Sequence, residues 1–377
     1  MSKLIKLISN GLKSDLFQLK YSNFIEQIQR VIPEAQYLKG TATVSAEGIA
    51  ENAAKELHGF KMADEEMRAF SGLLRFKDVI KGDEVSYQNF IECQKDARPP
   101  RPVLSYQSFQ EMGQYVRDKL TTPEDCAAAI WSVLCNDLGK VHEIVYAYKA
   151  LYPDSSMGHD AILAKLLNEK PELFPAFAAL PAEQRRKIIA GYASGCDISQ
   201  FEQLELPIVS LEALKILDKQ SLDMYILHSI FDVSGAAAHF KSNGSLTMHQ
   251  QTWDFFNATQ KCLGELANVS IETAYLNYLN YRGTCIGIEN NSEEATALIR
   301  IAGMARLATP EQGKMLKKVW NRLTLAMRNV LTKELNVHGG TGSRAIFVGY
   351  GVAILLNPQG AKQKILNEIF KPEEIKT

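Results

Sequence analysis

The sequence lacks the features that mark secreted and membrane-spanning proteins. Its six cysteines are scattered without CxxC spacing, which argues against a disulfide framework or a cysteine-based zinc site. No apolar run is long enough to cross a bilayer. Near the start, the apolar residues Leu4, Ile5, Ile8 and Leu12 recur at helical spacing, unlike a signal-peptide core. We therefore predict a cytoplasmic protein without a transmembrane segment.

The amphipathic N-terminus allows two interpretations. Such a helix can lie on a membrane surface, or it can pack its apolar side against the body of the protein, which we expect here. The chain also lacks an excess of charge of one sign, because 42 Lys and Arg residues meet 43 Asp and Glu residues. No nucleic-acid partner is therefore indicated.

Strand signals are scarce as well. The only candidates are 345–348 and 207–209, whereas apolar residues elsewhere recur with the helical period. The fold class is therefore predicted to be all-α. The expected helices comprise 14–32, two within 45–92, 105–119, 123–138, 142–151, 159–168, 211–218, 221–239, 252–267, 271–280, 293–307 and 310–334.

A proline-rich breaker at 97–102 suggests a domain boundary. The length of the chain allows two or three domains. We predict an N-terminal helical region at 1–98, a helical core at 99–268 and a C-terminal helical region at 269–377.

The segment 227–239 carries the most distinctive chemistry. In a helix, His228, Asp232, Gly235 and His239 fall on one stripe. Histidine and aspartate are ligands of hydrolytic Zn, Mn, Mg or Fe sites. A buried His–Asp hydrogen bond beside a small-residue helix contact is the structural alternative.

A second motif follows the apolar helix of 127–135. Asn136 and Asp137 lie at its end, and Gly139 and Lys140 come directly after. A carboxylate at the end of a buried helix is costly unless it is paired or bound to a cation. Lys140 could pair with Asp137 or meet a substrate phosphate. Further along, His159 begins another predicted helix.

The run 135–140 resembles the central motif of the HD-domain superfamily of metal-dependent phosphohydrolases. Asn136 occupies the place of the family's histidine, His159 resembles its next histidine, and Asp232 is the candidate for its closing aspartate. The resemblance implies an HD-like multi-helix core with additional N- and C-terminal helices. It also implies a divalent metal (Mg, Mn, Zn or Fe) held by Asp137, His159, Asp232 and, weakly, Asn136. Lys140 would neutralise the phosphate, and His228 or His239 would orient ligands or move a proton.

The family's earlier histidine has no counterpart, because no histidine occurs between His58 and His142. We expect the helix at 105–117 to occupy its place, with Gln107, Gln110 or Glu111 as substitutes. Amide and carboxylate oxygens suit hard cations such as Mg²⁺ better than they suit zinc.

A glycine-rich segment at 337–351 contains Arg344. Backbone N–H groups in such a loop can hold an anion, and Arg344 would add charge for phosphate binding. The glycines can equally serve tight turns and close helix packing.

Two functions follow from these motifs. The first is a metal-dependent phosphohydrolase or phosphodiesterase acting on a nucleotide-like or other phosphate ester. The second is a catalytically degenerate HD-like helical scaffold that binds a small molecule or a protein partner. Both predict that Asp137 and Asp232 converge across packed helices, with His159 or His228 reaching the same point. Convergence on a metal favours the enzyme, whereas convergence on a water or on Lys140 favours the scaffold.

Overall fold

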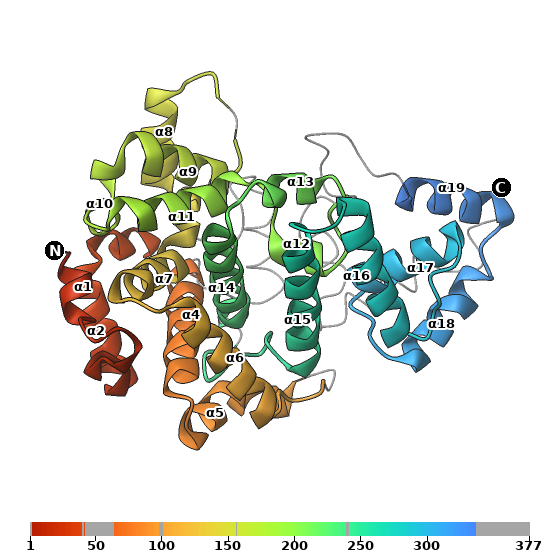
Figure 1. Ribbon diagram of the computed structural model, residues 1–377, viewed down its shortest axis with the longest axis horizontal. Coiled ribbons are helices and arrows are strands. Elements are labelled where there is room, and N and C mark those ends of the chain that lie inside the picture. The colour runs from red at the N-terminus through yellow and green to blue at the C-terminus, as the bar shows by residue number, and fades with distance from the viewer. Residues whose placement is uncertain are drawn as a thin grey trace. The chain divides into compact units, whose positions relative to one another are not determined.

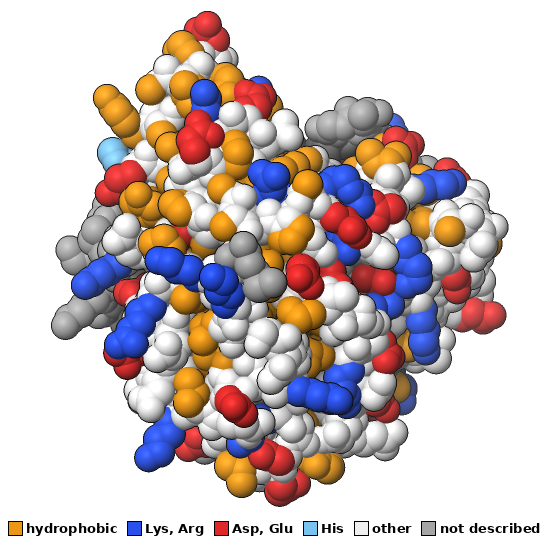
Figure 2. Space-filling view, turned by 60° about the vertical axis from the view of Figure 1, so that its left-hand side comes forward, with side chains coloured by type: hydrophobic (Ala, Val, Ile, Leu, Met, Phe, Trp, Pro, Cys, Tyr) orange, Lys and Arg blue, Asp and Glu red, His pale blue; other side chains and the backbone are white. Residues whose placement is uncertain are grey.

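Every regular element in the described part of the chain is a helix, as predicted. The computed structural model describes residues 2–39, 41, 64–97, 101–155, 157–238 and 241–336. Within these ranges, no helix is both long and apolar enough to cross a bilayer. Figure 2 shows acidic and basic side chains interspersed over one face, in keeping with the balanced composition.

The chain forms two compact units. The first comprises Met1–Gly195 and Leu217–Trp253, and the second Cys196–Ile216 and Asp254–Thr377. These limits differ from the predicted segments 1–98, 99–268 and 269–377. One reason is that helix α4 (Asp64–Lys81), which precedes the expected boundary, packs against helices that follow it.

The first unit contains α4 and most of the remaining helices. In chain order these are α1 (Lys3–Leu7), η1 (Gly11–Lys13), η2 (Asp15–Gln18), α2 (Tyr21–Val31), η3 (Pro33–Leu38), α5 (Glu84–Ile91), η4 (Glu92–Asp96), α6 (Tyr106–Lys119), α7 (Pro123–Cys135), η5 (Asn136–Lys140), α8 (His142–Leu151), α9 (His159–Glu169), η6 (Pro171–Leu173), α10 (Pro175–Ala178), α11 (Ala182–Ala193) and α14 (Lys219–Gly235).

The second unit is built from fewer helices. They are α12 (Ile198–Glu202), α13 (Ser210–Lys215), α15 (Gln250–Glu265, whose first turn belongs to the first unit), α16 (Ile271–Cys285), α17 (Glu293–Met304), α18 (Pro310–Trp320) and α19 (Leu325–Leu335).

The boundaries of these helices follow from local sequence signals. The Thr122 side chain accepts a hydrogen bond from Asp125 N at the start of α7, and Pro123 occupies the first turn. Where one helix was expected at 310–334 there are two, because Thr324 forms a new N-cap that accepts from Met327 N. The strand predicted at 207–209 is wrong, since these residues form a turn before α13. The other candidate, 345–348, lies outside the described residues.

The core of the first unit is centred on α7, which is buried from Asp125 to Cys135. Helices α4 and α14 pack against α7 and against each other (Figure 1). Rings of Phe76 and Phe231 meet edge to face across the α4–α14 contact, with centroids 5.0 Å apart. Leu4 and Ile5 of α1 are buried, and α1 contacts α7, so the predicted packing of the N-terminal helix is confirmed.

Candidate functional site

Asp137 lies in η5, the single 3₁₀ turn that continues α7. Its side chain is buried, and its Oδ1 lies 2.8 Å from Lys140 Nζ at the end of the same turn. His159 Nε2, at the start of α9, lies 3.8 Å from the same oxygen. Gly139 permits this approach, because a Cβ there would lie 2.0 Å from His159 O.

Helix α4 supplies two charged residues that the sequence analysis missed. Glu65 Oε1 accepts hydrogen bonds from Lys140 Nζ at 3.1 Å and from Arg68 Nη1 at 3.2 Å. Both side chains are almost wholly buried. One feature of the sequence could have indicated them: Glu65 and Arg68 are three residues apart, so they lie on the same face of a helix whose apolar side is buried.

The helix that we expected to contribute at this point does not. In α6, Gln107 donates to Glu111 and Gln110 donates to the carbonyl of Gly82. The expectation for Gln107, Gln110 and Glu111 was therefore wrong, because these side chains are used within α6 and at the α4–α5 turn.

Asp232 of α14 reaches the same cluster from another direction. Arg68 Nη2 lies 3.9 Å from Asp232 Oδ1, and Arg68 Nη1 lies 3.9 Å from Asp137 Oδ2. Asn136 Nδ2 donates a hydrogen bond of 3.0 Å to Asp232 Oδ1. The structure therefore brings Asp137 and Asp232 to Arg68, with Lys140 and His159 beside Asp137 and with Asn136 beside Asp232.

Glycines bring α14 this close to α4. A Cβ on Gly235 would lie 2.2 Å from the carbonyl oxygen of Arg68 and 2.6 Å from Gly72 N. The backbones of the two helices therefore touch at Gly235. This contact also places Asp232, one turn before Gly235, beside Arg68. This is the small-residue helix contact of the alternative interpretation, but the His–Asp hydrogen bond that the same interpretation included is not formed by His228.

His228 lies apart from the cluster, although it precedes Asp232 by one turn. Its ring is buried against Tyr192 and Tyr225. Neither ring nitrogen has a hydrogen-bond partner among the described residues. His239 and Arg344 lie outside the described residues.

The pKa values of the two buried carboxyl groups of the network, Asp137 and Glu65, shift in opposite directions. Burial would raise the pKa of Asp137, but the nearby Lys140 and Arg68 lower this pKa below its ordinary value. Burial, followed by the charge of Asp137, raises the pKa of Glu65 above its ordinary value. Of these two buried carboxyl groups, Asp137 is therefore the stronger acid and Glu65 the weaker.

A comparison with known protein families decides where the chain belongs. The model of a family described as "Family of unknown function (DUF6829)" matches residues 6–368. This chain belongs to that family. No curated protein and no solved structure matches it. The description of the DUF6829 family assigns no activity.

In this DUF6829 member, the side chains around Arg68 do not fit a divalent metal. Two cationic groups already lie against the carboxylates, and Asn136 directs its amide nitrogen, which cannot ligate, at Asp232. Across the described ranges, no three His, Cys, Asp or Glu side chains are placed to hold a metal. A metal held by Asp137, His159 and Asp232 would have to displace Arg68 and Lys140.

Proposed function

We propose that this protein is a binding protein on an HD-like helical scaffold, in which Arg68 and Lys140 take the place of a catalytic metal. The observation that carries the proposal is the position of Arg68, 3.9 Å from both Asp137 and Asp232. A guanidinium group there neutralises two carboxylates, as a metal would. It cannot, however, act as a metal Lewis acid that lowers the pKa of a bound water.

The outer side of the network indicates the chemistry of the ligand. The side chains of Asp232, His159 and Asp160 are 28%, 36% and 40% exposed. Two carboxylates and one imidazole favour a small molecule with an ammonium group or other hydrogen-bond donors. Arg68 and Lys140 already face carboxylates, which disfavours a phosphate ester.

The first test measures metal content and turnover together. We expect the purified protein to contain no stoichiometric Zn, Mn, Mg or Fe and to hydrolyse no generic phosphodiester when these metals are added. The metal-dependent phosphohydrolase predicted from the motif is the competing proposal. Stoichiometric metal that disappears in Asp137→Ala would support it and overturn ours.

A second test asks whether two substitutions turn the site into a zinc site. The double variant Arg68→His/Asn136→His supplies two imidazoles beside Asp137 and Asp232, and we expect it to bind about one Zn²⁺. The matched control, Arg68→Gln/Asn136→Gln, removes the same charge without adding an imidazole and should bind none. Equal zinc binding by both variants would contradict the assignment of Arg68 to the metal position.

The ligand class is tested by thermal shift. Putrescine, a small diamine, should raise the Tm of the wild type, and this rise should be lost in Asp160→Asn. Phenyl phosphate should leave the Tm unchanged. A larger shift with phenyl phosphate than with putrescine would reverse the inferred ligand chemistry.

A further inference from the structure

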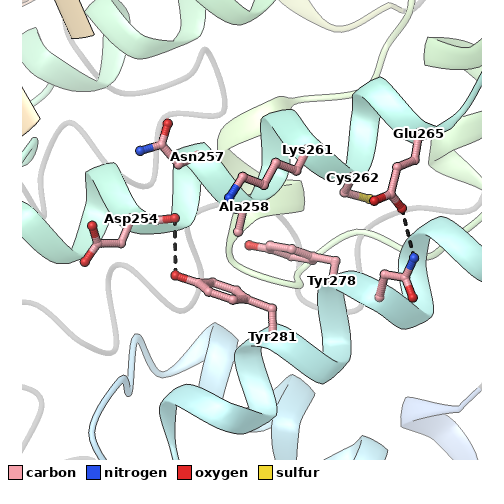
Figure 3. A pocket seen from close by; sticks show the side chains of 9 residues that line it. Asp254, Asn257, Ala258, Lys261, Cys262, Glu265, Tyr278 and Tyr281 are labelled. Atoms are coloured by element: carbon pink, nitrogen blue, oxygen red, sulfur yellow. Dashed lines mark hydrogen bonds between the residues drawn. The ribbon is translucent and has the colours of Figure 1, made fainter. Parts of the chain in front are cut away.

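The second unit contains a pocket that is separate from the ion-pair network. It measures about 350 Å³, within the usual range for sites that bind small molecules. All its lining residues come from α15 and α16: Asp254, Asn257, Ala258, Lys261, Cys262, Glu265, Asn277, Tyr278 and Tyr281. Figure 3 shows the two phenol rings projecting from α16 towards α15.

Hydrogen bonds at the two ends of the pocket join its walls. Asn277 Nδ2 donates to Glu265 Oε2 at 2.9 Å, and the Tyr281 hydroxyl donates to the carbonyl of Asp254 at 3.4 Å (Figure 3). Between them lies Ala258, whose short side chain leaves the middle open. The walls are therefore fixed at their ends, and the space between them is preformed.

The charges along α15 alternate on the side of the pocket. Lys261 is followed by Glu265 one turn later and preceded by Asp254 two turns earlier. Glu265 is bonded to Asn277, and within the described chain no carboxylate forms an ion pair with Lys261. The ammonium group of Lys261 can pair with a carboxylate of a ligand, and the carboxylate of Glu265, one turn later, can pair with an ammonium group of the same ligand.

The remaining lining gives the ligand's third feature. Tyr278 is buried, and its ring forms an apolar surface beside the half-exposed ring of Tyr281. The Cys262 thiol does not provide a nucleophile, because burial raises its pKa to about 12. The pocket is therefore suited to reversible binding.

We propose that the α15–α16 pocket binds a free α-amino acid with an apolar side chain. The ligand's carboxylate pairs with Lys261, its ammonium group faces Glu265, and its side chain lies on Tyr278 and Tyr281. This site is independent of the function proposed for the first unit.

Three small molecules test the charge requirement in the full-length protein. L-Phenylalanine is the probe, 3-phenylpropionate lacks its ammonium group, and phenethylamine lacks its carboxylate. We expect ligand-observed NMR to show saturable binding of L-phenylalanine. The affinity of each analogue should be lower by about tenfold or more. No binding of L-phenylalanine at millimolar concentration, or equal binding of 3-phenylpropionate, overturns the proposal.

Variants then place the ligand in this pocket. Lys261→Met should weaken L-phenylalanine binding about tenfold, and Ala258→Leu, which fills the middle of the pocket, should abolish it. Lys314→Met, at an exposed lysine on α18, is the matched control and should bind as the wild type does. Unchanged binding in Lys261→Met contradicts the proposal; because Lys261 is exposed, this variant should keep the fold, which its Tm checks.

Discussion

At the scale of single residues, the first unit depends on charges that neutralise one another inside the protein. Asp137 is buried against Lys140 and within reach of Arg68, and both cations are themselves largely buried. Removing one partner of a buried ion pair leaves the other charge without compensation, which costs far more than an exposed pair contributes.

We therefore expect Asp137→Asn to lower the free energy of unfolding by about 3–5 kcal/mol. The amide keeps the size of the side chain but removes the carboxylate that lies 2.8 Å from Lys140 Nζ, so that Lys140 keeps only Glu65, and Arg68 keeps Glu65 and Asp232. Urea denaturation measures the change. Asp160→Asn is the control, since this more exposed carboxylate on α9 should cost about 1 kcal/mol or less. Equal losses for the two variants would show that the buried network does not stabilise the fold.

In the second unit, Glu202 at the end of α12 gives a prediction about pH. Burial raises its pKa from 4.5 to about 7, although Arg282 and Arg306 partly oppose this shift. Between pH 4.5 and 7 the unfolded chain has released this proton and the folded chain still holds it. The group's contribution to stability is therefore present below pH 4.5 and is lost as the pH rises through 7.

Glu202→Gln removes this titration. Compared with the wild type, the variant should gain about 1–3 kcal/mol of stability between pH 5 and pH 8. Urea denaturation at a series of pH values gives the difference, with Glu311→Gln at an exposed position of α18 as the control. If the curves of wild type and Glu202→Gln run parallel, Glu202 does not hold a proton in the folded state.

At the scale of helices, glycines decide which side chains meet. Gly139 lets η5 touch the start of α9, and Gly235 lets α14 touch α4 near Gly72. These contacts place His159 beside Asp137 and Asp232 beside Arg68. A side chain at any of these positions would meet backbone atoms, which cannot move away as the end of a flexible side chain can.

Gly139→Ala tests this argument. Its Cβ would lie 2.0 Å from His159 O, so η5 and α9 must separate, and we expect a loss of about 2–4 kcal/mol in stability. Gly158→Ala is a close control, because a Cβ at Gly158, next to His159, meets no atom within 4 Å. That change should alter stability by about 0.5 kcal/mol or less. Calorimetric Tm values that fall equally in both variants would contradict the close-contact explanation.

At the scale of the whole molecule, each compact unit has its own buried polar centre. In the second unit, the Arg300 guanidinium donates to the carbonyls of Leu335 and Leu206, at 2.7 and 3.2 Å. One side chain of α17 thus joins the end of α19 to the segment after α12. The two segments are distant in the sequence, so the hydrogen bonds of this arginine are long-range contacts within the second unit.

Arg300→Met should therefore affect the second unit first. It keeps much of the apolar stem but leaves buried carbonyls without a donor, at a cost of about 2–4 kcal/mol. Hydrogen exchange measured by mass spectrometry should become faster in 204–206 and in α19. Exchange in α4, α7 and α14 should stay as in the wild type. Uniform acceleration of exchange across both units would show that the hydrogen bonds of Arg300 do not stabilise the second unit selectively.

The sequence by itself determined the helices, because caps and helical periodicity act within a few residues. The predictions at 105–119, 142–151 and 159–168 closely match α6, α8 and α9. The motif also singled out Asp137, Lys140 and Asp232, and the structure brings these side chains into one ion-pair network. Their spacing implied chemistry but not what would neutralise the carboxylates.

Only the tertiary structure decided that question. Arg68 and Glu65 come from a helix far earlier in the chain, and the Gly72–Gly235 contact brings that helix against α14. No local pattern records such a contact, since it depends on how helix surfaces fit across the core. A carboxylate pair that the sequence assigned to a metal is therefore accompanied by a guanidinium group, because packing, not spacing, selects the neighbouring cation.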